Sequence, residues 1–297
     1  MPPLVAAVAT ATIASEISRR FDTIALVIVG GAAALSTFRV GIQLASLRLP
    51  FKQALLTAGR LGAQSVEIDA RTELRPEEVS VTGLRQIRKM LSDANLSVAT
   101  VRFATRRGYH VADDLDRRVA ATKAAMRLAY ELRAPFVVNS IGRVPSEPSG
   151  EAWELLVQVL ADLANFGARA GAIFIARTGT EDGPTLARLL STLDAGSIGV
   201  DFDPAGLIEN GFSVDEAVQT LGSYVRHVRA RDAVRDPSRG RGVEVQLGRG
   251  SVDFPALLGA LENFAYRGDV TIERNNCDDP QREIGQAVAY LHELAAG

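Results

Sequence analysis

From Phe38 to the carboxyl terminus, short runs of β-branched and aromatic residues alternate with longer segments in which apolar residues recur every three or four positions. Short apolar runs of this kind predict buried strands, and the 3.6-residue period predicts amphipathic helices. Strands that alternate with helices along a chain are typical of βα units around a parallel sheet. Eight strands are predicted: Val40–Leu44, Ser65–Asp69, Val98–Phe103, Pro135–Asn139, Ala172–Arg177, Ile198–Asp203, Val225–Arg231 and Asp269–Arg274.

Residues that favour helix starts precede several of the helical segments. Ser80 or Thr82 is expected to cap the second helix, Asp113 the third, and Asp253, ahead of Pro255, the seventh. Eight βα units in about 260 residues predict a single α/β domain, a (β/α)₈ TIM barrel. A doubly wound open sheet is disfavoured, because it normally begins with a glycine-rich phosphate turn after the first strand, and none follows here.

Residues 1–38 differ from the barrel domain predicted for residues 39–297. We expect an amino-terminal extension that is disordered, carries a targeting signal or reflects an upstream start codon. Its apolar run, Ile24–Leu35, is shorter than the roughly 17–25 residues of a spanning helix, so no membrane association is expected. Arg19 and Arg20 ahead of that run resemble a twin-arginine export signal, but Asp22 argues against one. A cytoplasmic location is therefore predicted, with export as the alternative.

Composition and charge exclude several classes of function. Hydrophobic residues make up 47% and charged residues 23%, the balance of a globular protein with a sizeable core. A formal net charge of -2 gives no reason to expect nucleic acid as a partner, because binding a polyanion needs a broad basic face. Cys277 is the only cysteine, which excludes an internal disulfide and a cysteine-based zinc site.

Polar and charged residues stand at the carboxyl ends of the predicted strands. In a TIM barrel the residues that perform the chemistry come from these ends and from the loops that follow them. Charges at the ends of buried strands are costly unless they are paired or used. The set comprises Gln43, Glu67, Asp69, Arg102, Asn139, Arg177, Asp203, Arg229, Arg231, Glu273 and Arg274.

Five stretches stand out in combination: Ser65–Asp69, Val200–Ile208, His227–Asp232, Leu247–Phe254 and Gly268–Glu273. Together they resemble the xylose isomerase-like TIM barrels, which include sugar phosphate isomerases and epimerases and share their fold with an endonuclease branch. The resemblance extends from about Val40 to the carboxyl terminus. It implies a small-molecule partner, namely a sugar, a sugar acid or a sugar phosphate.

The family carries a metal-binding set of Glu, Asp, His and Glu on strands five to eight. Carried over by position, this set retains Asp203 and Glu273, but Arg177 and Arg229 stand where the strand-five glutamate and the strand-seven histidine belong. A guanidinium group is a permanent cation with no lone pair to donate to a metal. We therefore expect no metal and no other cofactor, with weak magnesium binding by the two remaining carboxylates as the alternative.

Adjacent strands lie about 4.8 Å apart, so these four side chains are expected to form an arc of alternating charge around the barrel mouth. One interpretation is a structural ring in which each arginine bonds its neighbouring carboxylates. The other is catalytic: Glu273 is the first candidate for a base, Asp203 the second, and Arg177 or Arg229 stabilises a developing enediolate.

Five further residues are candidates for substrate binding. The resemblance implies that Glu67 lies near the substrate. Here it is expected to pair with Arg102 or Arg106, and the alternative is that this ion pair is buried and has only a structural role. Arg106 and Arg231 suit phosphate or carboxylate groups, with solvated loop arginines as the alternative. His110 and Asn139 complete the set, in a loop and at a strand end respectively. Gly248 and Gly250 either allow a ligand to approach the backbone or only shape a turn.

The sequence thus predicts a sugar isomerase- or epimerase-like barrel that binds a small sugar or an acidic sugar derivative at its mouth without a metal. The alternative is a carbohydrate- or anion-binding barrel that has lost enzyme activity. Endonuclease activity is disfavoured, because its metal cluster needs several histidines and glutamates that this chain lacks. The formation of homo-oligomers stays open.

Overall fold

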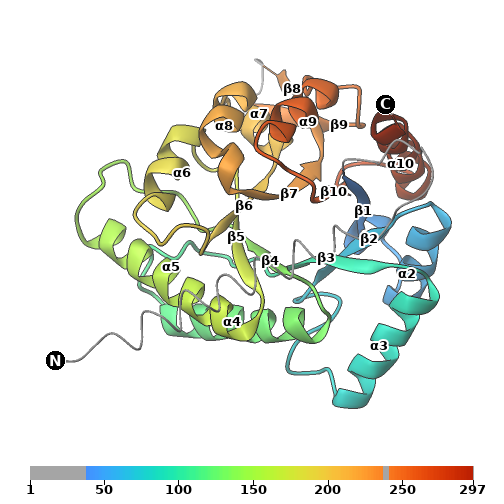
Figure 1. Cartoon of the computed structure of the whole chain (residues 1–297), viewed down its shortest axis with the longest axis horizontal. Coiled ribbons are helices and arrows are strands. Elements are labelled where there is room, and N and C mark those ends of the chain that lie inside the picture. Colours follow the sequence, from blue (N-terminus) through green and yellow to red (C-terminus); the bar gives the residue numbers. More distant parts are fainter. Residues whose placement is uncertain (1–37, 237–240, 297) are drawn as a thin grey trace. The chain divides into compact units, whose positions relative to one another are not determined.

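Eight parallel strands close into a barrel in the computed structural model, which describes residues 38–236 and 241–296. The first 37 residues, with the export signal considered above, lie outside the described part. Neighbouring strands pair in chain order around the barrel, and β1 closes against β10 (Figure 1). The TIM-barrel prediction is confirmed. The barrel strands are β1 (Arg39–Gln43), β2 (Ser65–Asp69), β3 (Ser97–Arg102), β4 (Phe136–Asn139), β5 (Ile173–Arg177), β6 (Gly199–Phe202), β7 (Val225–Ala230) and β10 (Asp269–Ile272).

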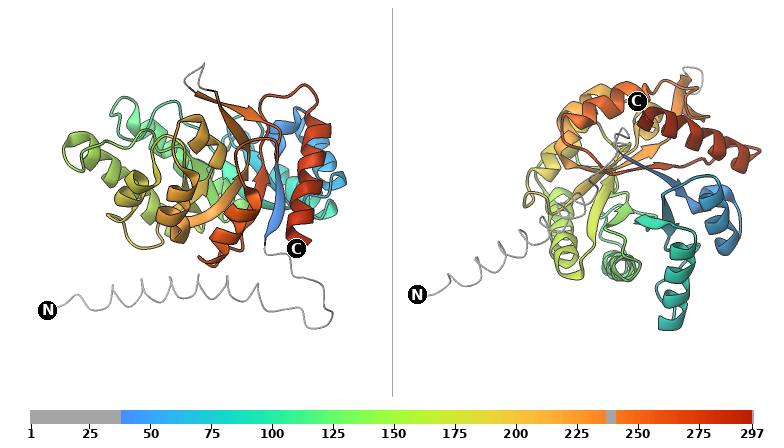
Figure 2. Two further views of the ribbon diagram at one scale, coloured as in Figure 1. Left: turned by 90° about the horizontal axis from the view of Figure 1, so that it is seen from above. Right: turned by 45° about the vertical axis from the view of Figure 1, so that its right-hand side comes forward.

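Helices surround the barrel and cover the outer face of its strands (Figure 2). Their apolar stripes point inward: in α5, for example, Leu156, Leu160 and Leu163 are fully buried. The helices are α2 (Phe51–Arg60), α3 (Val81–Asp93), α4 (Leu115–Glu131), α5 (Glu151–Ala170), α6 (Gly183–Leu190), α7 (Pro204–Glu209), α8 (Val214–Leu221), α9 (Phe254–Glu262) and α10 (Pro280–Ala296), with the short 3₁₀ helices η1 (Leu44–Leu47) and η2 (Gly222–Tyr224). None of the helices in the described part has both the length and the apolar character that crossing a bilayer requires.

Two of the predicted caps are confirmed and one is wrong. Ser80 accepts a hydrogen bond from the Gly83 backbone, and Asp253 accepts one from the Ala256 backbone. Asp113 does not cap α4, because the helix begins one residue later, after Asp114 in the left-handed region. The Asp113 side chain instead pairs with Arg107 within the same loop.

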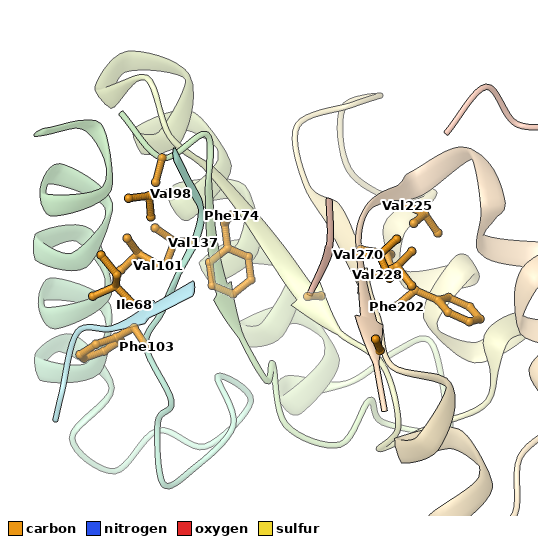
Figure 3. Packing of buried hydrophobic residues seen from close by; sticks show 14 of the residues in the cluster. Ile68, Val98, Val101, Phe103, Val137, Phe174, Phe202, Val225, Val228 and Val270 are labelled. Carbon is orange, nitrogen blue, oxygen red and sulfur yellow. The ribbon is translucent and has the colours of Figure 1, made fainter. Parts of the chain in front are cut away.

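The hydrophobic core lies between the strands and the helices. Ile68, Val101, Val137 and Phe174 are register partners on β2 to β5, and Figure 3 shows them with Phe202, Val228 and Val270 on the other side of the barrel. Because side chains alternate along a strand, the residues between them point to the barrel axis. Those residues are mainly polar, so the axis is filled by charges and hydrogen bonds rather than by aliphatic layers.

Gly41 on β1 leaves room for this polar interior. A Cβ atom at Gly41 would lie 2.6 Å from Thr271 Oγ1 and 2.8 Å from Ser65 Oγ, which is closer than real contacts allow. The Ser65 hydroxyl in turn donates to Asp269. A larger residue at position 41 would therefore push polar side chains of β2 and β10 apart.

An antiparallel hairpin, β8 (Asp232–Asp236) and β9 (Arg241–Val245), is inserted after β7. No strand was predicted from the sequence between Val225–Arg231 and Asp269–Arg274, where this hairpin lies. The hairpin contacts α7 and supplies Glu244 to the mouth of the barrel.

Asp232 fixes the glycine-rich loop that leads from the hairpin to α9. Its buried carboxylate accepts hydrogen bonds from the backbone of Ala233, Gly248, Gly250 and Val252. A Cβ atom at Gly250 would collide with this carboxylate. Of the two interpretations of these glycines, the structure supports the one in which they shape a turn.

Replacement of Asp232 by alanine is expected to lower the free energy of unfolding by about 2–4 kcal/mol, because four backbone N–H groups lose their acceptor. Urea denaturation followed by circular dichroism measures this change. Asp278→Ala, at an exposed position in the loop after β10, is the matched control and should leave stability nearly unchanged. Equal stability of the two variants would show that the carboxylate does not hold the loop.

Candidate functional site

Arg229 on β7 lies at the centre of the barrel and is completely buried. Its guanidinium contacts three carboxylates from three strands or strand ends. Nε donates to Asp201 at 2.6 Å, Nη1 donates to Glu273 at 2.6 Å, and Nη1 and Nη2 together form a bidentate pair with Glu67 at 3.0 and 2.6 Å. The donors of the planar guanidinium fork are therefore directed at carboxylate oxygens, the geometry in which arginine binds most strongly.

Arg177 is the last residue of β5. Its Nε and Nη2 donate to Asp203 at 3.0 and 2.6 Å, and its Nη1 lies 3.1 Å from Glu273. The side chain is 17% exposed, compared with 0% for Arg229. Of these two guanidiniums, only that of Arg177 reaches solvent to a useful extent.

Arg231, just after β7, is the third arginine at the mouth of the barrel. It donates to Asp203 at 2.7 Å and to Glu209 at 3.0 Å, and it lies 3.3 Å from Glu244 of the hairpin. We refer to the three arginines and four of the buried carboxylates that they bond as the arginine–carboxylate cluster: Arg177, Arg229, Arg231, Glu67, Asp201, Asp203 and Glu273.

The arginines hold the carboxylates in the charged form. Burial alone would raise the pKa of Glu67, but the charge and hydrogen bonds of Arg229 outweigh it and lower the pKa to about 2. Burial acts in the same direction on Glu273, whose pKa Arg177, Arg229 and Arg231 together hold well below its usual range. The pKa of Asp203 is likewise lowered, by Arg177 and Arg231. These groups are therefore weak bases near neutral pH.

The cluster does not fit a divalent metal ion. Asp203 directs one oxygen to Arg177 and Arg231 and the other to the backbone of Gly206, where it caps α7. Both oxygens of Glu273 are likewise occupied by donors. In the described part of the chain, no group of three or more His, Cys, Asp or Glu side chains is arranged to hold a metal. A dication here would displace guanidiniums and be repelled by them, a cost of several kcal/mol in order of magnitude.

The predicted arc of four side chains forms, with one difference in its pairing. Arg177 bonds Asp203 and Glu273 as expected, and Arg229 bonds Glu273. Arg229 does not reach Asp203. It bonds Asp201 instead, because the alternation along β6 directs Asp201 toward the barrel axis two residues earlier.

The expected partner of Glu67 was wrong. Glu67 pairs with Arg229 across the barrel, not with Arg102 or Arg106, and it also accepts from Gln43 and Thr100. Arg102 instead bonds Asp69 on the neighbouring strand at 2.7 Å. Sequence distance favoured the local arginines, whereas closure of the barrel leaves only β1 and β10 between β2 and β7 and lets their inward side chains meet.

Asn139 does not face the barrel mouth. It lies on the same face of β4 as Val137, which belongs to the outer hydrophobic layer. Its amide donates to the buried hydroxyl of Tyr109 at 2.8 Å and accepts from the Thr105 backbone, and so it holds the loop after β3. The structure therefore gives Asn139 a role in positioning a loop, and does not place it beside the other candidates.

The other two candidates lie outside the cluster. Arg106 is exposed in the loop after β3. His110, in the same loop, lines an open pocket of about 480 Å³ together with Arg143, Glu181, Asp182 and Phe212. Burial and the charge of Arg118 lower the pKa of His110, which favours the neutral imidazole.

Sequence reasoning missed three buried polar residues of the site. Asp201 and His227 form a chain across β6, β7 and β10, in which His227 lies 2.6 Å from Asp201 and 2.7 Å from the Thr271 hydroxyl. The alternating polar positions in Val200–Asp203 and Val225–Arg231 were a signal for this polar interior. Glu181 follows β5 in a loop, where neither periodicity nor a motif marks it.

The chain is similar to known proteins in both sequence and structure. A sequence model of the family described as "Xylose isomerase-like TIM barrel" matches residues 55–294. The crystal structure of a xylose isomerase domain protein from Planctomyces limnophilus superposes with a TM-score of 0.76 at 25% identity, covering 86% of this chain and 97% of that one. A D-psicose 3-epimerase from Clostridium cellulolyticum H10, solved with D-tagatose, has a TM-score of 0.70 at 15% identity, covering 87% and 99%.

A sequence relative gives a shorter match. An uncharacterized protein from Methanocaldococcus jannaschii is 26% identical over 192 residues, which cover 58% of this chain. The match spans 62% of that relative's length.

Replacement of Arg229 by methionine should lower the free energy of unfolding by about 3–5 kcal/mol, because it leaves three carboxylates buried without their common partner. Adding Glu67→Gln to Arg229→Met should restore part of the loss, since it removes one of the stranded charges. Urea denaturation of both variants measures these effects. The control is Arg85→Met at an exposed position of α3. If Arg229→Met were no less stable than this control, the cluster would not be the structural centre of the barrel.

Proposed function

Because this chain belongs to the xylose isomerase-like TIM barrel family, we propose that it binds a small sugar or an acidic sugar derivative at the carboxyl-terminal mouth of its barrel without a divalent ion at the centre. The observation that carries the proposal is the arginine–carboxylate cluster, in which Arg177 and Arg229 direct their donors at Asp203 and Glu273. The binding of D-tagatose by an epimerase of the same fold supports a sugar as the ligand class.

The state of the carboxylates favours binding over proton transfer. A general base works best when its pKa lies near the operating pH. The pKa values of Glu273 and Asp203 are held below their usual range, and their oxygens already accept from arginines or from the backbone of α7. Proton abstraction from a sugar carbon would require one of these oxygens to leave its guanidinium partner first.

A metal-independent isomerase or epimerase is the second candidate, and one observation favours it. Arg177 is partly exposed and contacts both Asp203 and Glu273, so a substrate oxygen that displaced it from Glu273 would meet a carboxylate and a guanidinium together. In that reaction Glu273 would take the proton from the carbon next to the carbonyl, and Arg177 would stabilise the enediolate.

Binding without a metal is tested by calorimetric titration of D-tagatose, D-xylose and D-glucuronate into the full-length protein. The dissociation constants should be the same in EDTA and in excess manganese, because no ligand contact passes through an ion. The EDTA-treated protein serves as its own control after manganese is added back. A sugar that bound only when manganese was present would contradict the proposal.

Proton exchange distinguishes the two candidates. With the same sugars in D₂O, nuclear magnetic resonance should detect no exchange at the carbon next to the carbonyl beyond the rate in buffer. The reason is that the carboxylates of Asp203 and Glu273 already accept hydrogen bonds from arginines. Exchange that the wild type catalyses and that Glu273→Gln abolishes would instead establish the isomerase or epimerase function.

A further inference from the structure

The pocket lined by His110 has features that the arginine–carboxylate cluster does not explain. It has a volume of about 480 Å³ and is formed by the loops after β3, β4 and β5 together with Phe212. None of the three arginines of the cluster lines it. The pocket opens on the carboxyl-terminal side of the barrel, because all three loops follow the carboxyl ends of their strands.

Glu181 is the central polar residue of the pocket. Its side chain belongs to a residue that is only 6% exposed, yet its Oε1 atom has no hydrogen-bond partner in the described part of the chain. Buried carboxyl oxygens are almost always hydrogen-bonded, and one that is not signals a missing partner. A ligand hydroxyl in the pocket would supply that partner.

The contacts of Thr180 indicate the protonation state of Glu181. Thr180 Oγ1 lies 2.6 Å from Glu181 Oε2 and 3.3 Å from the Gly142 carbonyl oxygen, but one hydroxyl has only one proton to donate. Both contacts are satisfied when a protonated Glu181 donates to Thr180 and Thr180 donates to the carbonyl. Burial raises the pKa of Glu181 to about 7, so the neutral carboxyl is well populated near neutral pH.

The groups that surround Glu181 leave the pocket close to electrically neutral. His110 contributes a second buried polar atom, Nδ1, that also lacks a partner in the described structure. The nearby charges are those of Asp182, whose carboxylate caps α6, of the exposed Arg143, and of Arg118, which acts on His110. Of these, only Asp182 and Arg143 line the pocket, and because they have opposite sign neither an anion nor a cation is strongly favoured.

The apolar part of the lining selects the shape of the ligand. Phe212, Val144 and Pro145 share the pocket with the two unpartnered polar atoms. A sugar or polyol presents hydroxyl groups that both donate and accept, and a face of C–H groups that packs on an aromatic ring. The carboxylate of an acidic ligand accepts hydrogen bonds but donates none, so it would leave Glu181 Oε1 without a donor.

We infer that this pocket is the ligand-binding site of the protein. It binds a neutral polyhydroxylated molecule, a sugar or a polyol, whose hydroxyl groups form hydrogen bonds with Glu181 and His110. The inference rests on the proposed function for the class of ligand. It differs in placing the ligand beside β3 to β5 instead of on the family's metal position, and in preferring neutral sugars to sugar acids.

The test is calorimetric titration of D-tagatose, D-xylose and xylitol, with D-glucuronate as the anionic counterpart, into the full-length protein and its variants. Glu181→Leu should weaken binding of the neutral compounds about tenfold or more, because it removes the buried polar partner. Glu181→Gln, which keeps a neutral hydrogen-bonding group of the same shape, should retain most of the affinity. Thermal unfolding confirms that each variant is folded, and Arg85→Met is the neutral control.

Three outcomes would overturn the inference. If Glu181→Leu bound as tightly as the wild type while Arg177→Met bound more weakly, the ligand would sit on the arginine–carboxylate cluster, and the proposed function would stand without this pocket. If D-glucuronate alone bound, the ligand class would be wrong. If none of the compounds bound the wild type, the inference and the proposed function would fail together.

Discussion

The barrel depends on one buried contact, that of the Arg229 guanidinium with Glu67, Asp201 and Glu273. An isolated charge at this depth would cost many kcal/mol, and the network persists because each charge has a partner at hydrogen-bond distance. The three carboxylates come from β2, β6 and the end of β10, so a single side chain ties together strands from around the barrel. Asp201 extends the network to His227 and Thr271. Arg177 and Arg231 extend it to Asp203, at the carboxyl-terminal mouth of the barrel.

This constraint also decides what the site can do. Carboxylates that are held ionised and hydrogen-bonded by arginines are good at positioning and poor at accepting protons. The same arginines bond the carboxylate oxygens that a divalent ion would use, which is why we propose binding without such an ion. What remains is a rigid, polar barrel centre beside a pocket whose polar atoms are unpartnered, which is an arrangement suited to recognition.

The sequence predicted the architecture well, because strand and helix periodicity are local properties. All eight barrel strands were located to within one or two residues, and Arg177 and Arg229 were expected beside Asp203 and Glu273, which each of them contacts at least in part. The partners were harder to predict. Glu67 was assigned to nearby arginines although barrel closure gives it Arg229, and Asn139 was assigned to the mouth although its strand turns it outward. The β8–β9 hairpin and Glu181 lacked any periodic signal, since their roles arise only from tertiary contacts.

The central claim is that guanidinium groups occupy the place in which this fold can hold a divalent ion. Anomalous X-ray diffraction from crystals grown in excess manganese tests it most directly. The account predicts no manganese peak between Asp203 and Glu273, with Arg177 and Arg229 bonded to them. A manganese ion bound by both carboxylates, with the two arginine side chains displaced, would contradict it.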